Sequence, residues 1–245
     1  MSQVLLDVKN IGINFGGLAA VSDLSFQVKT GEILGLIGPN GAGKSTTFNL
    51  ISGFYKLSTG KVYFHGVEIT NRPPEYLNRQ GIVRTFQSNV LFDSMTVSEN
   101  LYLGALMSGD KKAARLEQVD KILHFLDLYE VKNELAKNLS HGYQRMLGIG
   151  VALATKPKLL LLDEPLTGMN PVEIDRAVEI LQKINTEMKI TIVIVEHNMR
   201  AVMTLCHRIV VLNYGKKLFE GTPEEVRNNE EVIGAYLGKT AKTDS

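Results

Sequence analysis

The sequence predicts an α/β fold, in which a mostly parallel core sheet carries an N-terminal antiparallel β subdomain and an inserted α-helical subdomain. Short, uninterrupted apolar segments at residues 159–162 and 192–195 are typical of strands buried on both faces of a parallel sheet. Helix-length segments alternate with such strands along the chain. Near the N-terminus, apolar and polar residues alternate instead, which is typical of antiparallel strands.

The N-terminal segment predicts a small antiparallel sheet. Residues 4–9 and 24–28 alternate between apolar and polar side chains, and the segment IGINFGG at 11–17 is expected to turn the chain between them. Residues 61–69 predict a hairpin with the dipeptide HG at its tip.

The rest of the chain predicts buried strands, separate helices and one long helical block. The block covers residues 95–154, and within it residues 111–127 carry apolar side chains at helical spacing, including Ala113 and Leu116. The other expected elements are a strand at 32–37, a helix at 44–53, a strand at 159–162, a helix at 172–188, a strand at 191–195, a helix at 198–206 and strands at 208–212 and 216–220.

We therefore expect one domain, in which a helical subdomain interrupts the catalytic core and a short C-terminal extension follows it. The extension is expected to form a strand, a turn and a helix, and the small polar residues after it predict a disordered tail. The expected boundaries are 1–238 for the domain, 1–87 and 155–220 for the core with its antiparallel part, 88–154 for the helical subdomain, 221–238 for the extension and 239–245 for the tail.

Composition excludes several classes of protein. The chain has 245 residues, 44% of them hydrophobic, which is enough for a sizeable core. Its 27 basic and 26 acidic residues nearly cancel, so no nucleic-acid partner is expected. The single cysteine, Cys206, cannot form an intrachain disulfide and is expected to pack as a small apolar side chain. No apolar run is long enough to span a membrane and no secretory signal is apparent, so we expect a soluble chain.

A phosphate-binding loop is the strongest motif. The segment GPNGAGKST fits the pattern G-x-x-x-x-G-K-[ST] and lies between a predicted buried strand and a predicted helix, as this motif requires. Its backbone N–H groups and the helix N-terminus would surround phosphates. The lysine would reach the β- and γ-phosphates, and the serine hydroxyl would ligate Mg²⁺. The predicted contacts are Gly38, Pro39, Asn40, Gly41, Ala42, Gly43, Lys44, Ser45 and Thr46.

Charged side chains follow two other predicted strands. Asp163 and Glu164 end the segment LLLLDE, and His197 follows the segment IVIVE. Ligands bind at the carboxyl ends of strands in open α/β sheets. One carboxylate is expected to hold Mg²⁺ through water and the other to act as general base, while the histidine would donate to a phosphate. A strand that ends in Asp-Glu can also be a solvated turn, and a lone histidine is often structural.

In combination and in this order, these motifs resemble those of an ATP-binding cassette (ABC) ATPase, a P-loop NTPase domain. The resemblance covers nearly the whole chain and includes Phe15, the segment RTFQ ending at Gln87, and GMNP at residues 168–171. It implies that Phe15 stacks on adenine, although Phe15 could also pack in the core. It further implies that Gln87 contacts Mg²⁺ or the attacking water, that Glu164 is the catalytic base and that His197 is the switch histidine.

The segment LSHGYQR at 139–145 departs from the Leu-Ser-Gly-Gly-Gln pattern of this family. Ser140 is expected to cap a helix that runs over residues 141–154. The resemblance implies that Ser140 and Gly142 contact the γ-phosphate held by a second subunit. His141 and Tyr143 replace the usual glycine and glutamine, and His141 could pack at the subunit interface or donate to phosphate.

The loop at 168–170 resembles the segment that crosses between two such subunits. The family usually has aspartate where this chain has Asn170, which questions a charged contact there.

The finer resemblance is to the ATPase subunit of branched-chain (hydrophobic) amino acid importers. It implies ATP and Mg²⁺ as cofactors, a second ABC ATPase subunit, transmembrane permease subunits and an extracytoplasmic substrate-binding protein. It also implies a peripheral location on the cytoplasmic face of the cell membrane. In addition, we expect an apolar patch within residues 88–99 to contact a helix of a membrane subunit, although some of these side chains must pack under the helical lobe.

Other functions remain as alternatives. Urea import is the nearest, lipopolysaccharide export is more distant, and a soluble ABC ATPase of an assembly machine, such as iron–sulfur cluster assembly, is the main non-transport alternative. A GTPase is disfavoured because no N-K-x-D motif is present, and a chromosome or repair ATPase because no long coiled coil separates Lys44 from Ser140. A translation-factor ATPase would carry two cassettes.

Overall fold

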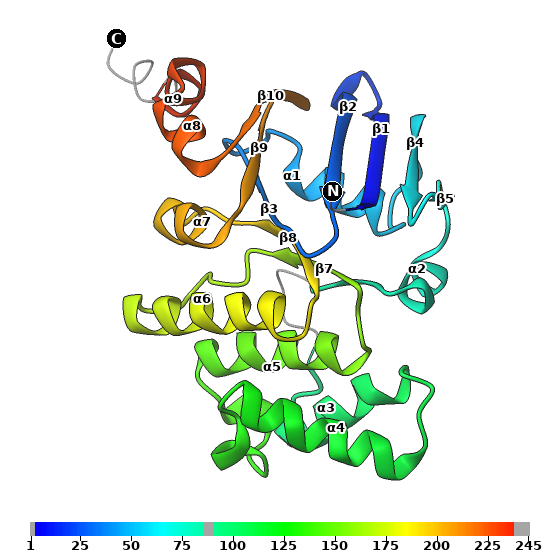
Figure 1. The fold of residues 1–245 in the computed structure, drawn as a ribbon, viewed down its shortest axis with the longest axis vertical. Coiled ribbons are helices and arrows are strands. Elements are labelled where there is room, and N and C mark those ends of the chain that lie inside the picture. Colours follow the sequence, from blue (N-terminus) through cyan, green and yellow to red (C-terminus); the bar gives the residue numbers. More distant parts are fainter. Residues whose placement is uncertain (1–2, 86–90, 238–245) are drawn as a thin grey trace. The chain divides into compact units, whose positions relative to one another are not determined.

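The computed structural model describes residues 3–85 and 91–237. These residues form two compact units (Figure 1). The first unit combines Met1–Leu77 with Thr191–Ser245, and the second unit is Asn78–Ile190.

An antiparallel sheet begins the first unit, as the sequence predicts. Its strand order is β2-β1-β4-β5. The tip between β4 and β5 is the expected His-Gly pair, whose φ angles of 49° and 77° suit a tight hairpin turn. The strands are β1 (Val4–Phe15), β2 (Leu18–Lys29), β4 (Thr59–Phe64) and β5 (Val67–Glu68).

The prediction of a turn at residues 11–17 is wrong for most of this segment. Strand β1 continues to Phe15 and turns only at Gly16-Gly17. The register of β1 against β2 shifts between Val8 and Ile11, a segment that includes Asn10 with a φ of 49°, so the ladder continues past an irregularity there. Because Ile11 and Ile13 are buried, this pairing places two apolar side chains in the core.

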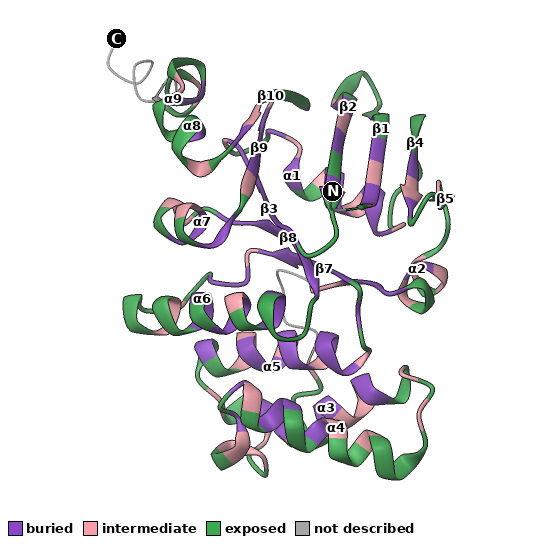
Figure 2. Ribbon diagram, viewed as in Figure 1, coloured by how far each residue is buried: buried purple, intermediate pink, exposed green. Residues whose placement is uncertain are grey.

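A second set of strands in the first unit has the order β10-β9-β3-β8. Strand β3 is parallel to both β8 and β9, and β10 returns antiparallel to β9. Every residue of β3 and β8 is buried, which explains why both read as continuous apolar runs (Figure 2). The strands are β3 (Ile33–Ile37), β8 (Thr191–Val195), β9 (Arg208–Asn213) and β10 (Lys216–Gly221).

The C-terminal extension has two helices after β10 instead of the single expected helix. Thr222 begins the first of them with a capping box, in which its hydroxyl accepts from the Glu225 backbone and Glu225 accepts from the Thr222 backbone. Residues 238–245, which include the whole of the expected tail at 239–245, lie outside the described part of the chain. The helices that involve the first unit are α1 (Lys44–Ile51), α2 (Pro74–Gln80, which continues into the second unit), α7 (Met199–Leu205), α8 (Pro223–Asn228) and α9 (Glu230–Leu237).

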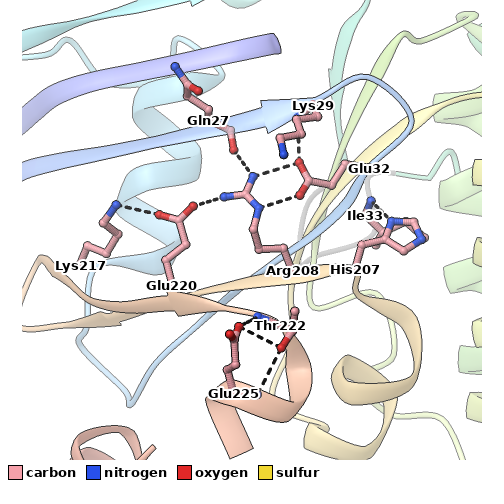
Figure 3. A network of polar contacts seen from close by, with 10 residues as sticks. All are labelled: Gln27, Lys29, Glu32, Ile33, His207, Arg208, Lys217, Glu220, Thr222 and Glu225. Carbon is pink, nitrogen blue, oxygen red and sulfur yellow. Dashed lines mark hydrogen bonds and ion pairs between the residues drawn. The ribbon is translucent and has the colours of Figure 1, made fainter. Parts of the chain in front are cut away.

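Arg208 joins several elements of the first unit through ion pairs (Figure 3). Its guanidinium donates to both carboxylate oxygens of Glu32 at 2.8 and 3.0 Å, and to Glu220 on β10. Glu32 is 8% exposed and also accepts from the Lys29 backbone at 2.7 Å. Nearby, His207 accepts from the backbone N–H of Ile33 through Nδ1. The start of β3, the start of β9 and β10 are thus held by one charged network.

The second unit combines two parallel strands with the expected helical block. In α4, Val119, Ile122 and Leu123 are buried, but Ala113 and Leu116 are exposed, so the apolar face is shorter than predicted. Among the described residues, no helix is both long and apolar enough to cross a bilayer. The elements are β6 (Ile82–Arg84), β7 (Leu159–Asp163), α3 (Val97–Leu106), α4 (Lys112–Phe125), α5 (His141–Ala154), α6 (Pro171–Thr186) and short 3₁₀ turns at Tyr129–Val131 and Ala136–Asn138.

Candidate functional site

The phosphate loop, residues 38–46, leaves the buried strand β3 and enters α1 in the first unit. A Cβ atom at Gly38 would lie 2.2 Å from the Leu212 carbonyl oxygen, so no larger residue fits there. Gly43 has a φ of 98°, and a Cβ atom there would lie 2.7 Å from the Ala20 carbonyl. The loop is therefore packed tightly against the neighbouring strands.

Helix α1 begins after Gly43 with no side-chain cap among the described residues. The first backbone N–H groups of a helix lack partners within the helix, and an anion can take them. Ser45 is exposed in this first turn. The arrangement matches a binding site for a phosphate group.

Lys44 is folded across the phosphate loop. Its ammonium group donates to the carbonyl oxygens of Gly38 at 2.7 Å and Pro39 at 3.1 Å, and the residue is only 6% exposed. The Lys44 ammonium group thus lies over the loop, where a positive charge would attract a bound phosphate.

Phe15 ends β1 and is 46% exposed, so it is not a core side chain as its alternative interpretation required. Its ring meets that of Tyr55 edge-to-face, with centroids 5.3 Å apart. Tyr55 is 40% exposed and was not singled out from the sequence. An exposed aromatic pair is compatible with stacking on a base.

His197 follows β8 and is exposed at its carboxyl end. The buried Glu196 carboxylate accepts from the backbone N–H of His197 at 2.9 Å and of Asn198 at 3.3 Å. Asn198 then caps α7 by accepting from the Ala201 backbone. The backbone that carries His197 is thus fixed by hydrogen bonds from both sides.

Asp163 and Glu164 lie at the end of β7 in the second unit. Asp163 is 4% exposed and pairs with Arg84 at 2.7 Å, a partner on the adjacent strand β6 that sequence reasoning missed. Its other oxygen, Oδ1, is buried and accepts no hydrogen bond from the described residues. A magnesium-bound water would supply such a donor, so Asp163 fits the expected metal role. Glu164 has a φ of 50°, a left-handed conformation that non-glycine residues adopt at an energetic cost.

Ser140 begins α5 as predicted, and its hydroxyl accepts from the Tyr143 backbone at 3.4 Å. Gly142 is buried and packs closely against α6. A Cβ atom at this position would lie only 2.7 Å from the Glu173 carboxylate. A Cβ atom on Gly168 would lie 3.6 Å from Nδ1 of His141. The His141 ring therefore lies beside the loop at 168–170 of its own subunit.

Asn170 performs the capping task without a charge. Its side-chain oxygen accepts from the Val172 and Glu173 backbones at 3.0 Å, and Glu173 accepts in return from the Asn170 backbone at 2.9 Å. This capping box starts α6. A neutral amide therefore caps the helix at the position where the family that the sequence resembles usually has aspartate.

Gln87, predicted both as a catalytic residue and as a metal ligand, lies outside the described residues, as does the beginning of the 88–99 patch. Farther along this patch, Phe92 is 55% exposed. Asn100, which sequence reasoning missed, is 1% exposed and bonds to the backbone on both sides of the turn, accepting from Phe92 and donating to Thr96. The buried Asn100 side chain therefore stabilises the turn that carries Phe92.

These features define a P-loop nucleotide-binding protein, in which a phosphate loop joins a buried parallel strand to a helix. Comparison with known proteins then gives the family. Residues 21–167 match the family described as ABC transporter, and residues 216–242 match that described as branched-chain amino acid ATP-binding cassette transporter. The chain belongs to the ABC transporter family and is an ATPase of this family.

Individual relatives agree with this assignment. The chain is 41% identical to the high-affinity branched-chain amino acid transport ATP-binding protein LivG of Salmonella typhimurium, over 98% of this chain and 100% of the relative. A crystal structure of an ABC transporter's ATP-binding cassette in its ADP conformation matches with a TM-score of 0.89 and 33% identity, over 97% of this chain and 100% of that one. A dimeric bacterial ABC transporter cassette matches with a TM-score of 0.80 and 25% identity, over 89% and 99% of the two chains.

Proposed function

We propose that this chain is the ATP-hydrolysing subunit of an importer for branched-chain and other hydrophobic amino acids. The observation that carries the proposal is the similarity to LivG, at 41% identity across almost the whole chain. The separate match of residues 216–242 to a family of branched-chain amino acid cassettes supports the same substrate class.

The phosphate loop would hold ATP. Lys44 would release the carbonyl oxygens that it now contacts and bind the β- and γ-phosphates, while residues 38–46 would surround them with backbone N–H groups. Phe15 would stack on the adenine. Ser45 and Asp163, with Gln87, would hold Mg²⁺. The metal would neutralise phosphate charge and orient the γ-phosphate.

Glu164 would act as the general base that accepts a proton from the attacking water. His197 would donate a hydrogen bond to the γ-phosphate, and Gln87 would help to position the water. General base catalysis contributes about 10²–10⁴-fold to a rate. Glu164→Gln should therefore bind ATP but hydrolyse it about 10²–10⁴ times more slowly.

A second ABC ATPase subunit would complete the site. Ser140 and Gly142 at the start of α5 would contact the γ-phosphate held by the phosphate loop of the other subunit. ATP would then favour the closed pair because it binds that state more tightly, and hydrolysis would release it. Dimeric arrangement in a related cassette supports this proposal.

The remaining partners would be membrane permease subunits and an extracytoplasmic substrate-binding protein, and the chain would lie on the cytoplasmic face of the cell membrane. The turn around Phe92 would contact a helix of a permease subunit. Phe92→Asp should abolish transport while the isolated chain still hydrolyses ATP. Normal transport by this variant would argue against the proposed contact.

Uptake of labelled leucine, isoleucine, valine and urea tests the function in cells that lack the chain. We expect these cells to lose amino acid uptake and to recover it when the parent chain is supplied. Glu187→Gln, a control at an exposed carboxylate at the end of α6, should also restore uptake, whereas Glu164→Gln should not. Unchanged uptake of all three amino acids would contradict the proposal, and selective loss of urea uptake would favour the urea alternative. Copurification with permease subunits would exclude a soluble assembly ATPase.

A further inference from the structure

Phe15 and Tyr55 bring together two segments of the first unit that are separate in the chain. Phe15 ends β1, and Tyr55 lies in the turn that follows α1. Their rings meet edge-to-face at an interplanar angle of 75°, with centroids 5.3 Å apart. Aromatic rings attract each other in this geometry because the positive edge of one ring faces the negative face of the other. The two residues are nevertheless 46% and 40% exposed, so the pair keeps surface for a further contact.

The segment around Phe15 is loosely packed. The two residues after it are Gly16, whose φ is 57°, and Gly17. As far as the structure describes the chain, a Cβ atom added at either glycine would have no atom within 4 Å apart from its chain neighbours. Leu18, the partner of Phe15 across the β1–β2 ladder, is 70% exposed. The hairpin tip therefore has little packing of its own to fix the direction of the Phe15 ring.

The segment around Tyr55 is fixed to α1. The Asn49 carbonyl accepts from the backbone N–H groups of Phe54 at 2.9 Å and Tyr55 at 3.1 Å. Gly53 in the same turn has a φ of 78°, and a Cβ atom there would lie 2.4 Å from the Arg72 carbonyl oxygen. The turn is thus hydrogen-bonded to the helix and packed closely against other backbone. Tyr55 is therefore the more firmly held partner of the pair.

The same two elements reach the phosphate loop. The Ala20 carbonyl in β2 lies so close to Gly43 that a Cβ atom on this glycine would come within 2.7 Å of it. Helix α1 begins at Lys44 in the loop and has eight residues. At a rise of 1.5 Å per residue, it places the turn that carries Tyr55 roughly 12 Å from the loop. The β1–β2 hairpin and α1 thus connect the aromatic pair to the phosphate loop.

We propose that Tyr55 is a positioning residue, which holds the ring of Phe15 in place for stacking on the base of the bound nucleotide. The inference rests on the proposed function in one respect, namely that Phe15 stacks on adenine. A ring that is already oriented loses less conformational freedom when the base binds, so more of the stacking energy contributes to affinity. Because Tyr55 acts through Phe15, its contribution concerns the base and not the phosphates.

Binding of two ligands to the purified full chain, measured by calorimetry, tests this role. The non-hydrolysable analogue AMP-PNP with Mg²⁺ presents the base and the phosphates, whereas inorganic tripolyphosphate with Mg²⁺ presents phosphates alone. Tyr55→Leu removes the ring but keeps an apolar side chain. We expect its Kd for AMP-PNP to rise about 3- to 10-fold, as the loss of an edge-to-face pair predicts, and its Kd for tripolyphosphate to equal that of the parent. The KM for ATP should rise with the Kd, while kcat at saturating ATP should stay within about twofold of the parent.

Further variants separate positioning from other effects. Tyr55→Phe keeps the ring and should bind both ligands as the parent does, because the ring contact does not need the hydroxyl. Phe15→Leu should weaken AMP-PNP binding at least as much as Tyr55→Leu, and adding Tyr55→Leu to it should cause no further loss. Tyr214→Leu, at an 82% exposed tyrosine between β9 and β10, is the matched control and should bind both ligands as the parent does.

A parent-like Kd for AMP-PNP in Tyr55→Leu would overturn the inference. An equal rise in the Kd for tripolyphosphate would also overturn it, because the loss would then not concern the base. Additional weakening when Tyr55→Leu is combined with Phe15→Leu would do the same, since Tyr55 would then act independently of Phe15.

Two results would instead contradict the proposed stacking on adenine, and the inference would fall with it. They are a parent-like Kd for AMP-PNP in Phe15→Leu, and a parent chain that binds AMP-PNP no more tightly than tripolyphosphate. Neither result involves a variant of Tyr55, so the two failures are distinguishable.

Discussion

The ion pair between Arg84 and Asp163 should be important for stability, and Arg84→Met tests this directly. Methionine keeps much of the apolar stem of the arginine but removes the guanidinium. The change leaves the Asp163 carboxylate without the partner that lies 2.7 Å from its Oδ2. Since Asp163 is only 4% exposed, water cannot replace the lost contact without a local rearrangement.

The expected loss follows from the burial of both partners. The side chains of Arg84 and Asp163 are 7% and 4% exposed, so solvent screens the pair weakly. Two unit charges about 4 Å apart attract by about 4 kcal/mol at an effective dielectric constant of about 20. Removing one partner of a buried pair typically costs about 3–5 kcal/mol. We therefore expect Arg84→Met to lower the free energy of unfolding by about 3–5 kcal/mol.

Urea unfolding followed by circular dichroism measures this loss, since the chain has no tryptophan for fluorescence. Adding Asp163→Asn to Arg84→Met removes the unpaired charge and should restore most of the lost stability. Arg176→Met is the matched control, because its pair with Asp127 is more than half exposed and should contribute less than about 1 kcal/mol. A loss below about 1 kcal/mol in Arg84→Met, or no recovery in the double variant, would refute the reasoning.

Three further predictions concern single positions. Gly142→Ala should lower the melting temperature because its Cβ would displace the Glu173 carboxylate from the α6 capping box. In a chain that already carries Glu173→Ala, Gly142→Ala should not lower the melting temperature further, because the clashing carboxylate is absent. Asn170→Ala should cost about 1 kcal/mol of unfolding free energy in urea titrations, while Asn170→Asp should cost nothing, since both native hydrogen bonds use a side-chain oxygen. Burial raises the pKa of the Cys206 thiol to about 12, so iodoacetamide should label this thiol at pH 8 only after unfolding. The free energy of unfolding should fall above about pH 9, because there only the unfolded chain releases this proton.

Elements with a strong local pattern could be predicted from the sequence. The buried strands β3, β7 and β8 each contain an uninterrupted apolar run, and the helix start at Ser140 carries a capping residue. The end of β1 could not be predicted, because Gly16 and Gly17 are preceded by a segment whose strand pairing depends on an irregularity at Asn10. That irregularity requires the partner strand and has no clear signal in the local sequence.

Some residues of the candidate site could likewise be predicted from the sequence, and others could not. Lys44, Asp163 and Glu164 belong to contiguous motifs and could be identified from spacing alone. Arg84 could not, because its contact with Asp163 joins residues that are far apart in the chain. The assigned chemical roles of the site residues stay predictions.

The first unit is assembled from the two ends of the chain, and this has a consequence for protein synthesis. The backbone N–H of Gly31 donates to a side chain 160 residues later, and that of Ile33 donates to His207, 174 residues later. At a synthesis rate of about 5–20 residues per second, strand β3 waits roughly 8–35 s for these partners. During that interval the continuous second unit can emerge and fold first. The apolar strand that precedes the phosphate loop is thus exposed to aggregation and chaperone binding until its partner strands β8 and β9 have been synthesised.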